Sequence, residues 1–265
     1  MLHKLKEEDF LVLRGPFESK RQSPNALGAA FILAIFGQAL FLFLESFIGG
    51  YSMYPFKDEI FKVHLVLSCV LGGLSLIYSI PAVFSRSQKM QYFINTLVSQ
   101  NLFGVSAYLV ALIAIGTEIS DEAVLLQFTA ITLIIGGIVF LITIVRFGML
   151  LKKGEYKKGS KKDKLRNKFE TSSYIPLVII VGIGVSFIIQ FLIRNFNTGS
   201  YDLIFIITLA VGLFWTMLFV LPEQLVLQYC KSRFDSFNYE QNGELKPVKG
   251  DDVNSMTDSE LKFRN

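Results

Sequence analysis

Six long apolar blocks constrain this chain more than any other feature of its sequence. They cover residues 26–49, 61–84, 97–116, 123–151, 174–193 and 201–221, and no block has a charged residue at its centre. A helix needs about 20 apolar residues to cross a hydrocarbon core about 30 Å thick. The first block is also longer than the apolar part of a signal peptide, which has about 7–15 residues. The sequence therefore predicts an all-α integral membrane bundle of about six transmembrane helices.

The distribution of basic residues predicts the orientation of these helices. Of the 26 Lys and Arg residues, 22 lie in residues 1–25, 85–96, 152–173 and 222–265. The loop at residues 117–122, on the opposite side of the membrane, is acidic instead. Because loops rich in Lys and Arg stay in the cytoplasm, we expect both termini to be cytoplasmic. The Lys-, Asn-, Phe- and Ile-rich composition is typical of a low-GC bacterium, so the expected location is the cell membrane.

The chain divides into three regions. Residues 1–25 alternate apolar and charged side chains and predict a cytoplasmic, partly amphipathic segment. Residues 26–230 hold the transmembrane helices, and the loops between them are too short to fold as separate domains. Residues 231–265 mix charges, Gly and Ser without periodicity, which predicts a disordered cytoplasmic tail.

Signatures of a catalytic or cofactor-binding protein are missing from the sequence. The two histidines and two cysteines form no cluster with metal-ligand spacing, and no phosphate-binding loop or catalytic motif is present. Cys69 and Cys230 lie at different membrane depths, so no disulfide between them is expected. The Lys-rich loop lacks the aromatic residues and the folded frame of a nucleic-acid interface. We therefore expect no enzyme activity, no cofactor and no nucleic-acid partner.

Three polar residues at the outer end of the first two spans are a candidate functional group. Glu45 lies in the last turn of the first span, Gln38 lies on about the same face, and His64 lies in the first turn of the second span. A short loop joins these helices, which puts Glu45 and His64 at similar depth. Burial of ionisable groups in hydrocarbon is expensive and usually functional. Two interpretations fit: a Glu–His pair at the mouth of a proton-linked pathway, or two separate side chains at headgroup level.

A second candidate pair lies at the cytoplasmic boundary. Arg146 sits near the end of the fourth span, and Glu223 follows Pro222 at the end of the sixth. These side chains could form a structural ion pair between the two helices. Alternatively, Arg146 extends to lipid phosphates and needs no protein partner.

Small residues recur at helical spacing in the even-numbered spans and predict faces for close helix packing. The positions are Ser68, Gly72 and Ser75 in the second span, Thr132 and Gly136 in the fourth, and Thr208 and Gly212 in the sixth. This repeat suggests three helical hairpins whose even-numbered members line the centre of the bundle. Trp215 and Phe219 continue the face in the sixth span and would block an open pore there.

The function that these features favour is a permease-type protein or the membrane subunit of a transport or export system, with a substrate that the sequence does not name. Because no nucleotide-binding motif is present, coupling to ATP would require a separate ATPase subunit. A non-transporting membrane partner, such as a secretion accessory or an immunity protein against a membrane-active toxin, also fits the sparse charge and short loops. The lipid bilayer is the partner that the composition requires. The oligomeric state does not follow from the sequence pattern.

Overall fold

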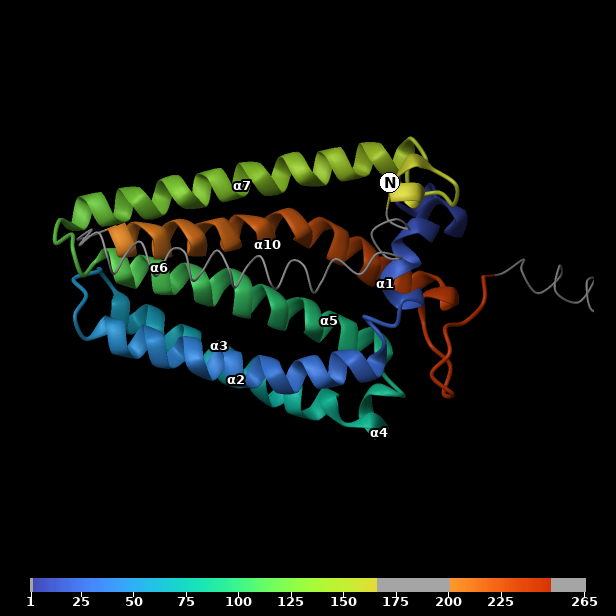
Figure 1. Ribbon diagram of the computed structural model, residues 1–265, viewed down its shortest axis with the longest axis horizontal. Helices are drawn as coiled ribbons and strands as arrows, with labels where there is room; N and C mark the ends of the chain where they lie inside the picture. The colour runs from blue at the N-terminus through green and yellow to red at the C-terminus, as the bar shows by residue number, and fades with distance from the viewer. Residues whose placement is uncertain (1, 166–200, 249–265) are drawn as a thin grey trace, which may run out of the picture.

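The protein forms an elongated bundle of long helices (Figure 1). The computed structural model describes residues 2–165 and 201–248, and within them five helical segments are long and apolar enough to cross a membrane. These segments are α2 (Pro24–Gly49), α3 (Lys57–Ser79), a third helix over Gln88–Ile115, α7 (Glu122–Lys152) and α10 (Tyr201–Arg233). The third helix consists of α5 (Gln88–Ser99), the π-helical turn η3 (Gln100–Ser106) and α6 (Ala107–Ile115). The predicted all-helical fold is confirmed for the described residues, and their five apolar helices are consistent with a membrane bundle. The predicted span at 174–193 lies outside the described residues.

Local chemistry sets the ends of these helices. Ser23 accepts a hydrogen bond from the Ala26 N–H at the start of α2, and Asp121 caps the start of α7 in the same way. Ile80 is extended and Pro81 begins the short helix α4 (Pro81–Phe84), so the second span ends at Ser79. Proline disfavours helical backbone in the residue before it, which explains this break.

The third helix is central in the bundle, between α2 and α3 on one side and α7 and α10 on the other (Figure 1). In its most apolar stretch 67% of the residues are buried, whereas none of the other four long helices exceeds 28%. It starts with polar turns at Gln88, so it begins earlier than the predicted residue 97. The prediction that the even-numbered spans line the centre is therefore wrong for the described residues.

The small-residue faces do not meet one another. A methyl group added at Gly136 would lie 2.8 Å from Leu218 Cδ1, so this glycine lets α7 approach α10 closely. Gly72 and Gly212 have no atom within 4 Å of such a methyl group among the described residues. The first hairpin, α2 with α3, packs closely, but α7 packs mainly on α10 rather than on α6. Equal spacing in sequence therefore did not produce equivalent packing roles.

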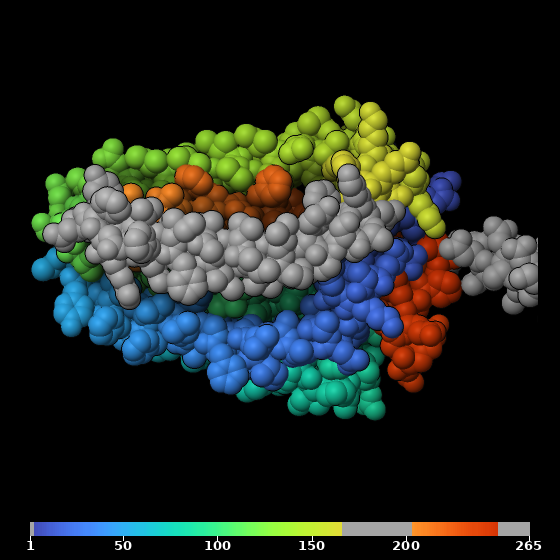
Figure 2. Space-filling view, in the orientation of Figure 1, coloured from blue at the N-terminus to red at the C-terminus, as the bar shows by residue number. Residues whose placement is uncertain are grey.

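A folded cap closes the end of the bundle where the N-terminal segment lies. We define the cap as residues 2–23, 153–165 and 234–248, and Figure 2 shows these segments gathered at one end. The first of them contains η1 (Leu2–Lys4), η2 (Glu7–Arg14) and α1 (Gly15–Glu18), and the last contains η4 (Asp235–Phe237). The rings of Phe10, Phe17 and Phe237 are fully buried there. The prediction of a disordered tail is thus wrong for residues 231–248.

Polar contacts fix the C-terminal segment in the cap. The Arg14 guanidinium donates to the Lys246 carbonyl at 3.0 Å, and the Tyr239 hydroxyl donates to the Phe17 carbonyl at 2.6 Å. Burial raises the pKa of Tyr239 to about 12, against a smaller opposing effect of Arg14, so the hydroxyl remains a donor at neutral pH.

Replacing Phe237 with Ala is expected to loosen the cap. The substitution removes a fully buried ring from the cluster around Phe10 and Phe17, and such cavities cost about 3–5 kcal/mol of unfolding free energy. Thermal unfolding of the detergent-solubilised protein measures the loss. Phe43→Ala is the matched control, because this ring is 64% exposed on the outside of α2. Equal effects of the two variants would contradict an anchoring role for Phe237.

Candidate functional site

A cluster of polar side chains lies buried where α2, α3 and the π-helical turn meet. Its members are Gln38 and Glu45 from α2, His64 and Ser68 from α3, and Asn101 and Ser106 from η3. Each of these residues is at most 3% exposed. Sequence analysis singled out Gln38, Glu45 and His64 as polar candidates, and the structure brings them into one network.

Glu45 and His64 are the ionisable centre of this network. Glu45 Oε2 lies 2.8 Å from His64 Nδ1, and both side chains are almost fully buried. The interpretation of two separate side chains at headgroup level does not describe this geometry. A carboxylate and an imidazole in direct contact can share or transfer a proton.

The other nitrogen of His64 contacts two serines. His64 Nε2 lies 3.2 Å from Ser68 Oγ and 3.1 Å from Ser106 Oγ. A hydroxyl group both donates and accepts, so these serines can satisfy the ring in its neutral and in its protonated form. Ser68 was expected to be a helix-packing residue, and it is in fact a polar ligand of the histidine.

Asn101 joins the histidine side of the cluster to Gln38. Its Nδ2 donates to Ser68 Oγ at 3.0 Å and to Gln38 Oε1 at 3.3 Å, and Gln38 Nε2 donates to the Ala34 carbonyl at 3.4 Å. Asn101 and Ser106 were missed by sequence reasoning. The available signal was a run of polar residues, Ser99 to Asn101, inside the third apolar block.

The π-helical turn explains how Asn101 and Ser106 both reach side chains of α3, Ser68 and His64 respectively. Residues five positions apart in an α-helix point about 140° away from each other. A turn closed by i→i+5 hydrogen bonds returns nearly to its starting face after five residues. The η3 turn therefore directs both side chains toward α3. Single π-turns of this kind occur frequently at functional sites.

The donor direction of the Asn101 amide is compatible with one tautomer of His64. Because Asn101 donates to Ser68, Ser68 can donate onward to His64 Nε2, and His64 then donates from Nδ1 to Glu45. This arrangement holds a neutral imidazole and a carboxylate, with a net charge of −1. One additional proton makes the cluster neutral, and Ser106 is within reach to accept the N–H that this proton would place on Nε2.

A cavity connects Glu45 to the end of the bundle opposite the cap. It has a volume of about 290 Å³, and its lining includes Glu45, Ser46, Gly49, Lys57, Asp58 and Phe61. Among the described residues, Glu45 Oε1 has no hydrogen-bond partner. The Lys57 ammonium donates to the Gly49 carbonyl at 2.7 Å, so it caps the end of α2 at the cavity wall. The cavity therefore lies next to Glu45, whose carboxylate is itself fully buried.

A second polar contact joins the π-helical turn to α10. Gln100 Nε2 donates to the Met217 carbonyl at 3.1 Å and to Gln224 Oε1 at 2.8 Å. Gln224 Nε2 lies 3.4 Å from Ser99 Oγ. These contacts flank Pro222, which lies inside α10 and has no N–H to donate to the preceding turn. Two irregular stretches of helix are thus hydrogen-bonded to each other.

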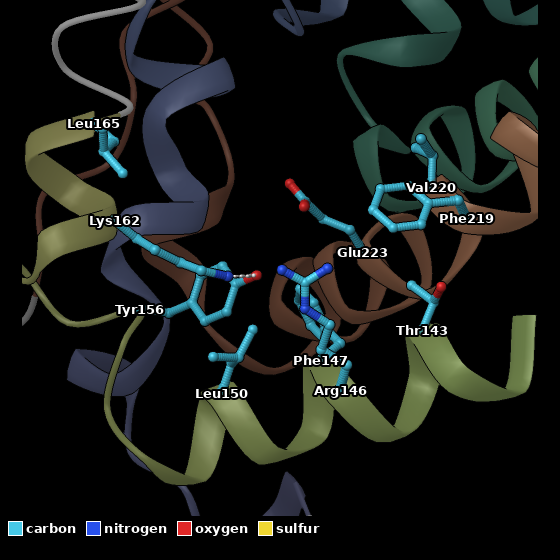
Figure 3. A pocket seen from close by; sticks show the side chains of 10 residues that line it. All are labelled: Thr143, Arg146, Phe147, Leu150, Tyr156, Lys162, Leu165, Phe219, Val220 and Glu223. Carbon is cyan, nitrogen blue, oxygen red and sulfur yellow. Dashed lines mark hydrogen bonds between the residues drawn. The ribbon is translucent and has the colours of Figure 1, made fainter. Parts of the chain in front are cut away.

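The remaining predicted residues lie elsewhere. Arg146 and Glu223 line one cavity at the cap end (Figure 3), and among the described residues no ion pair joins them to each other. The Thr132 hydroxyl lies 2.7 Å from the Tyr108 hydroxyl, and the Trp215 indole donates to the Thr132 carbonyl at 3.0 Å. Ser75 and Thr208 donate back to carbonyls of their own helices. These contacts hold helices together or satisfy local backbone groups.

No group of three or more His, Cys, Asp or Glu side chains that could hold a metal ion occurs in residues 2–165 and 201–248. Comparison of the chain with protein-family models, with curated proteins and with solved structures found no match. The chemistry of the cluster is therefore the basis for assigning a function.

Removing His64 is expected to destabilise the protein more than removing the charge of Glu45. His64→Ala leaves a buried carboxylate without its partner, which costs about 3–5 kcal/mol. Adding Glu45→Gln to His64→Ala removes that charge, so the double variant should recover part of the loss. Thermal unfolding of the four proteins in detergent measures this coupling. Additive effects of the two substitutions would mean that the pair is not energetically linked.

Proposed function

We propose that the chain is a permease-type membrane transport protein whose working cycle includes protonation of the Glu45–His64 pair. The main observation behind this proposal is the 2.8 Å contact between Glu45 and His64, which are both almost fully buried among the long apolar helices. In this proposal the protein lies in a bacterial cell membrane with both termini in the cytoplasm. The substrate class is a small solute, and an ATPase subunit is not needed for the proton step.

The free-energy cost of burying these polar side chains supports a functional role for the cluster. A buried ion pair stabilises a fold no better than well-packed apolar side chains of similar volume. Ionisable residues inside membrane bundles accordingly mark ion or proton pathways in most cases. A pair that served only to pack α2 against α3 would need neither a carboxylate nor the hydroxyl groups of Ser68 and Ser106.

Access to the pair from one end supports transport rather than static packing. The cavity beside Glu45 opens at the end opposite the cap, whereas the cap covers the other end. In this arrangement a proton would reach the pair from the cavity side, after a small opening beside the buried carboxylate. Such one-sided access is what a coupled transporter requires.

Contacts between η3 and α10 support a conformational response to the proton. Asn101 and Ser106 contact the cluster, while Gln100 in the same turn contacts the Met217 carbonyl of α10. A change of hydrogen bonding at His64 would therefore act on the turn that also holds the Pro222 region.

Proton-driven uptake into liposomes tests the proposal. The full chain is reconstituted, an inward proton gradient is imposed, and solutes accumulated from a bacterial metabolite extract are identified by mass spectrometry. We expect at least one solute to accumulate, its accumulation to stop with a protonophore, and Glu45→Gln to abolish it. Glu59→Gln is the matched control, because this exposed carboxylate begins α3 outside the cluster.

Accumulation of the solute by Glu45→Gln at the rate of the unsubstituted protein would reject the proton-linked role. The alternative function is a non-transporting membrane partner, favoured by the short loops and by the dense packing of the cap. In that case Glu45→Gln would leave the cellular phenotype of the gene intact while a variant of the cap abolished it.

Replacing Gln100 with Leu tests the link to α10. Leu fills a similar volume but donates no hydrogen bond to the Met217 carbonyl or to Gln224. We expect a stability loss of about 1–3 kcal/mol and a slower gradient-driven uptake. Ser99→Ala is the control, because it removes the long contact with Gln224 and a bond to the Thr96 carbonyl of its own helix but leaves both contacts of Gln100 in place. Uptake that falls equally in both variants would remove Gln100 from the coupling mechanism.

A further inference from the structure

The second cavity of the bundle, at the cap end, has the chemistry of an anion site with apolar walls. It has a volume of about 500 Å³ and lies between α7, α10 and the cap segment 153–165 (Figure 3). The residues that matter for the inference are Arg146, Leu150, Lys162, Phe219, Val220 and Glu223. None of them belongs to the Glu45–His64 cluster.

The charges in this cavity favour a ligand with one negative charge. Among the described lining residues, Arg146 and Lys162 contribute two positive charges and Glu223 contributes one negative charge, which gives a net charge of +1. Arg146 is exposed, and among the described residues no hydrogen bond or ion pair holds its guanidinium. A guanidinium can bind two oxygens of one phosphate.

Lys162 is held in a defined position at the cavity. Its ammonium donates to the Tyr156 hydroxyl at 2.8 Å and lies 4.1 Å from the centre of the Tyr156 ring. Tyr156 is itself buried in the cap. The contacts with Tyr156 therefore hold the Lys162 ammonium in place, unlike the ammonium of an unrestrained surface lysine.

The depth of Arg146 fits the headgroup region of a membrane. Arg146 lies six residues before Lys152, the last residue of α7, which corresponds to about 9 Å along the helix. Beyond Lys152, the cap segment 153–165 has six more Lys residues: Lys153, Lys157, Lys158, Lys161, Lys162 and Lys164. Basic pockets between transmembrane helices on the cytoplasmic side bind anionic lipid headgroups.

Apolar side chains line the side of the cavity toward the middle of the bundle. Phe219 is 49% exposed and Val220 is 37% exposed, and both come from the turn before Glu223. An acyl chain could lie against them while its phosphate contacts Arg146. A free inorganic phosphate would leave these apolar walls uncovered.

We propose that this cavity binds an anionic phospholipid of the cytoplasmic leaflet, with its phosphodiester between Arg146 and Lys162 and an acyl chain along Phe219 and Val220. The site would also connect lipid to the cap. The Tyr156 carbonyl accepts from the Val12 N–H at 3.0 Å, and Lys157 forms an ion pair with Asp9 at 3.1 Å. The inference rests on the proposed orientation, with the cap in the cytoplasm, and not on proton-linked transport.

The single tryptophan of the chain serves as a probe for this site. Trp215 lies one helical turn before Phe219 in α10. Phosphatidylglycerol with brominated acyl chains, titrated into nanodiscs of unlabelled phosphatidylcholine that contain the full chain, should quench Trp215 fluorescence. Brominated phosphatidylcholine at the same fraction gives the background from non-specific lipid contact.

We expect phosphatidylglycerol to quench at an apparent binding constant at least about fivefold stronger than phosphatidylcholine, since each basic residue contributes about that factor. Arg146→Gln should remove most of this preference, and Arg146→Lys should retain part of it. Lys153→Gln is the matched control, because this exposed residue lies at the end of α7 outside the cavity lining. Excess inorganic phosphate should not compete.

Three results would overturn the proposal. Equal quenching by the two lipids would exclude headgroup recognition. A loss with Lys153→Gln as large as with Arg146→Gln would indicate diffuse attraction to the Lys-rich surface. Competition by inorganic phosphate would indicate a site for the free anion. If Arg146→Gln fails to fold, the comparison of Arg146→Lys with Lys153→Gln still decides: equal binding constants reject the site.

Discussion

Burial of the Glu45 carboxylate against His64 is the constraint on which the polar interior of the bundle depends. A carboxylate that is 1% exposed among apolar helices needs a donor, and His64 at 2.8 Å provides it. The second ring nitrogen of His64 then needs partners of its own, which are Ser68 and Ser106. Because Ser106 belongs to the third helix, satisfying one carboxylate requires three helices to meet at one point.

The central position of the third helix follows from this requirement. It is the helix that contacts α2 and α10 along much of its length, and its π-helical turn faces both the cluster and the Pro222 region. An uninterrupted α-helix would place Asn101 and Ser106 on different faces and leave one of their contacts unmade. The irregular turn thus resolves a conflict between helix geometry and polar satisfaction.

The sequence predicts where the helices lie along the chain but not which helices pack against each other, and both results have physical reasons. Apolar length is a local property, so it correctly located α2, α3 and α7. The small-residue spacing is local too, but packing depends on the partner: Gly136 is close to Leu218, whereas Gly72 has no such neighbour among the described residues. The π-helical turn has no periodic signature. In the tail, Phe237 anchors the chain as a single side chain, which no period can predict.

The two ends of the bundle play different chemical roles. At one end a cavity leads to Glu45; at the other, aromatic rings of the cap close the bundle. Under the proposed function this asymmetry corresponds to one state of a cycle, and the opposite state must open the cap end. Regions whose helical hydrogen bonding is already irregular can bend at a low cost in free energy. These regions are η3 and the turn around Pro222. Gln100 joins these two regions. Protonation that changes the contacts of Ser106 could therefore shift α10 through the η3 turn, without disturbing the regular helices.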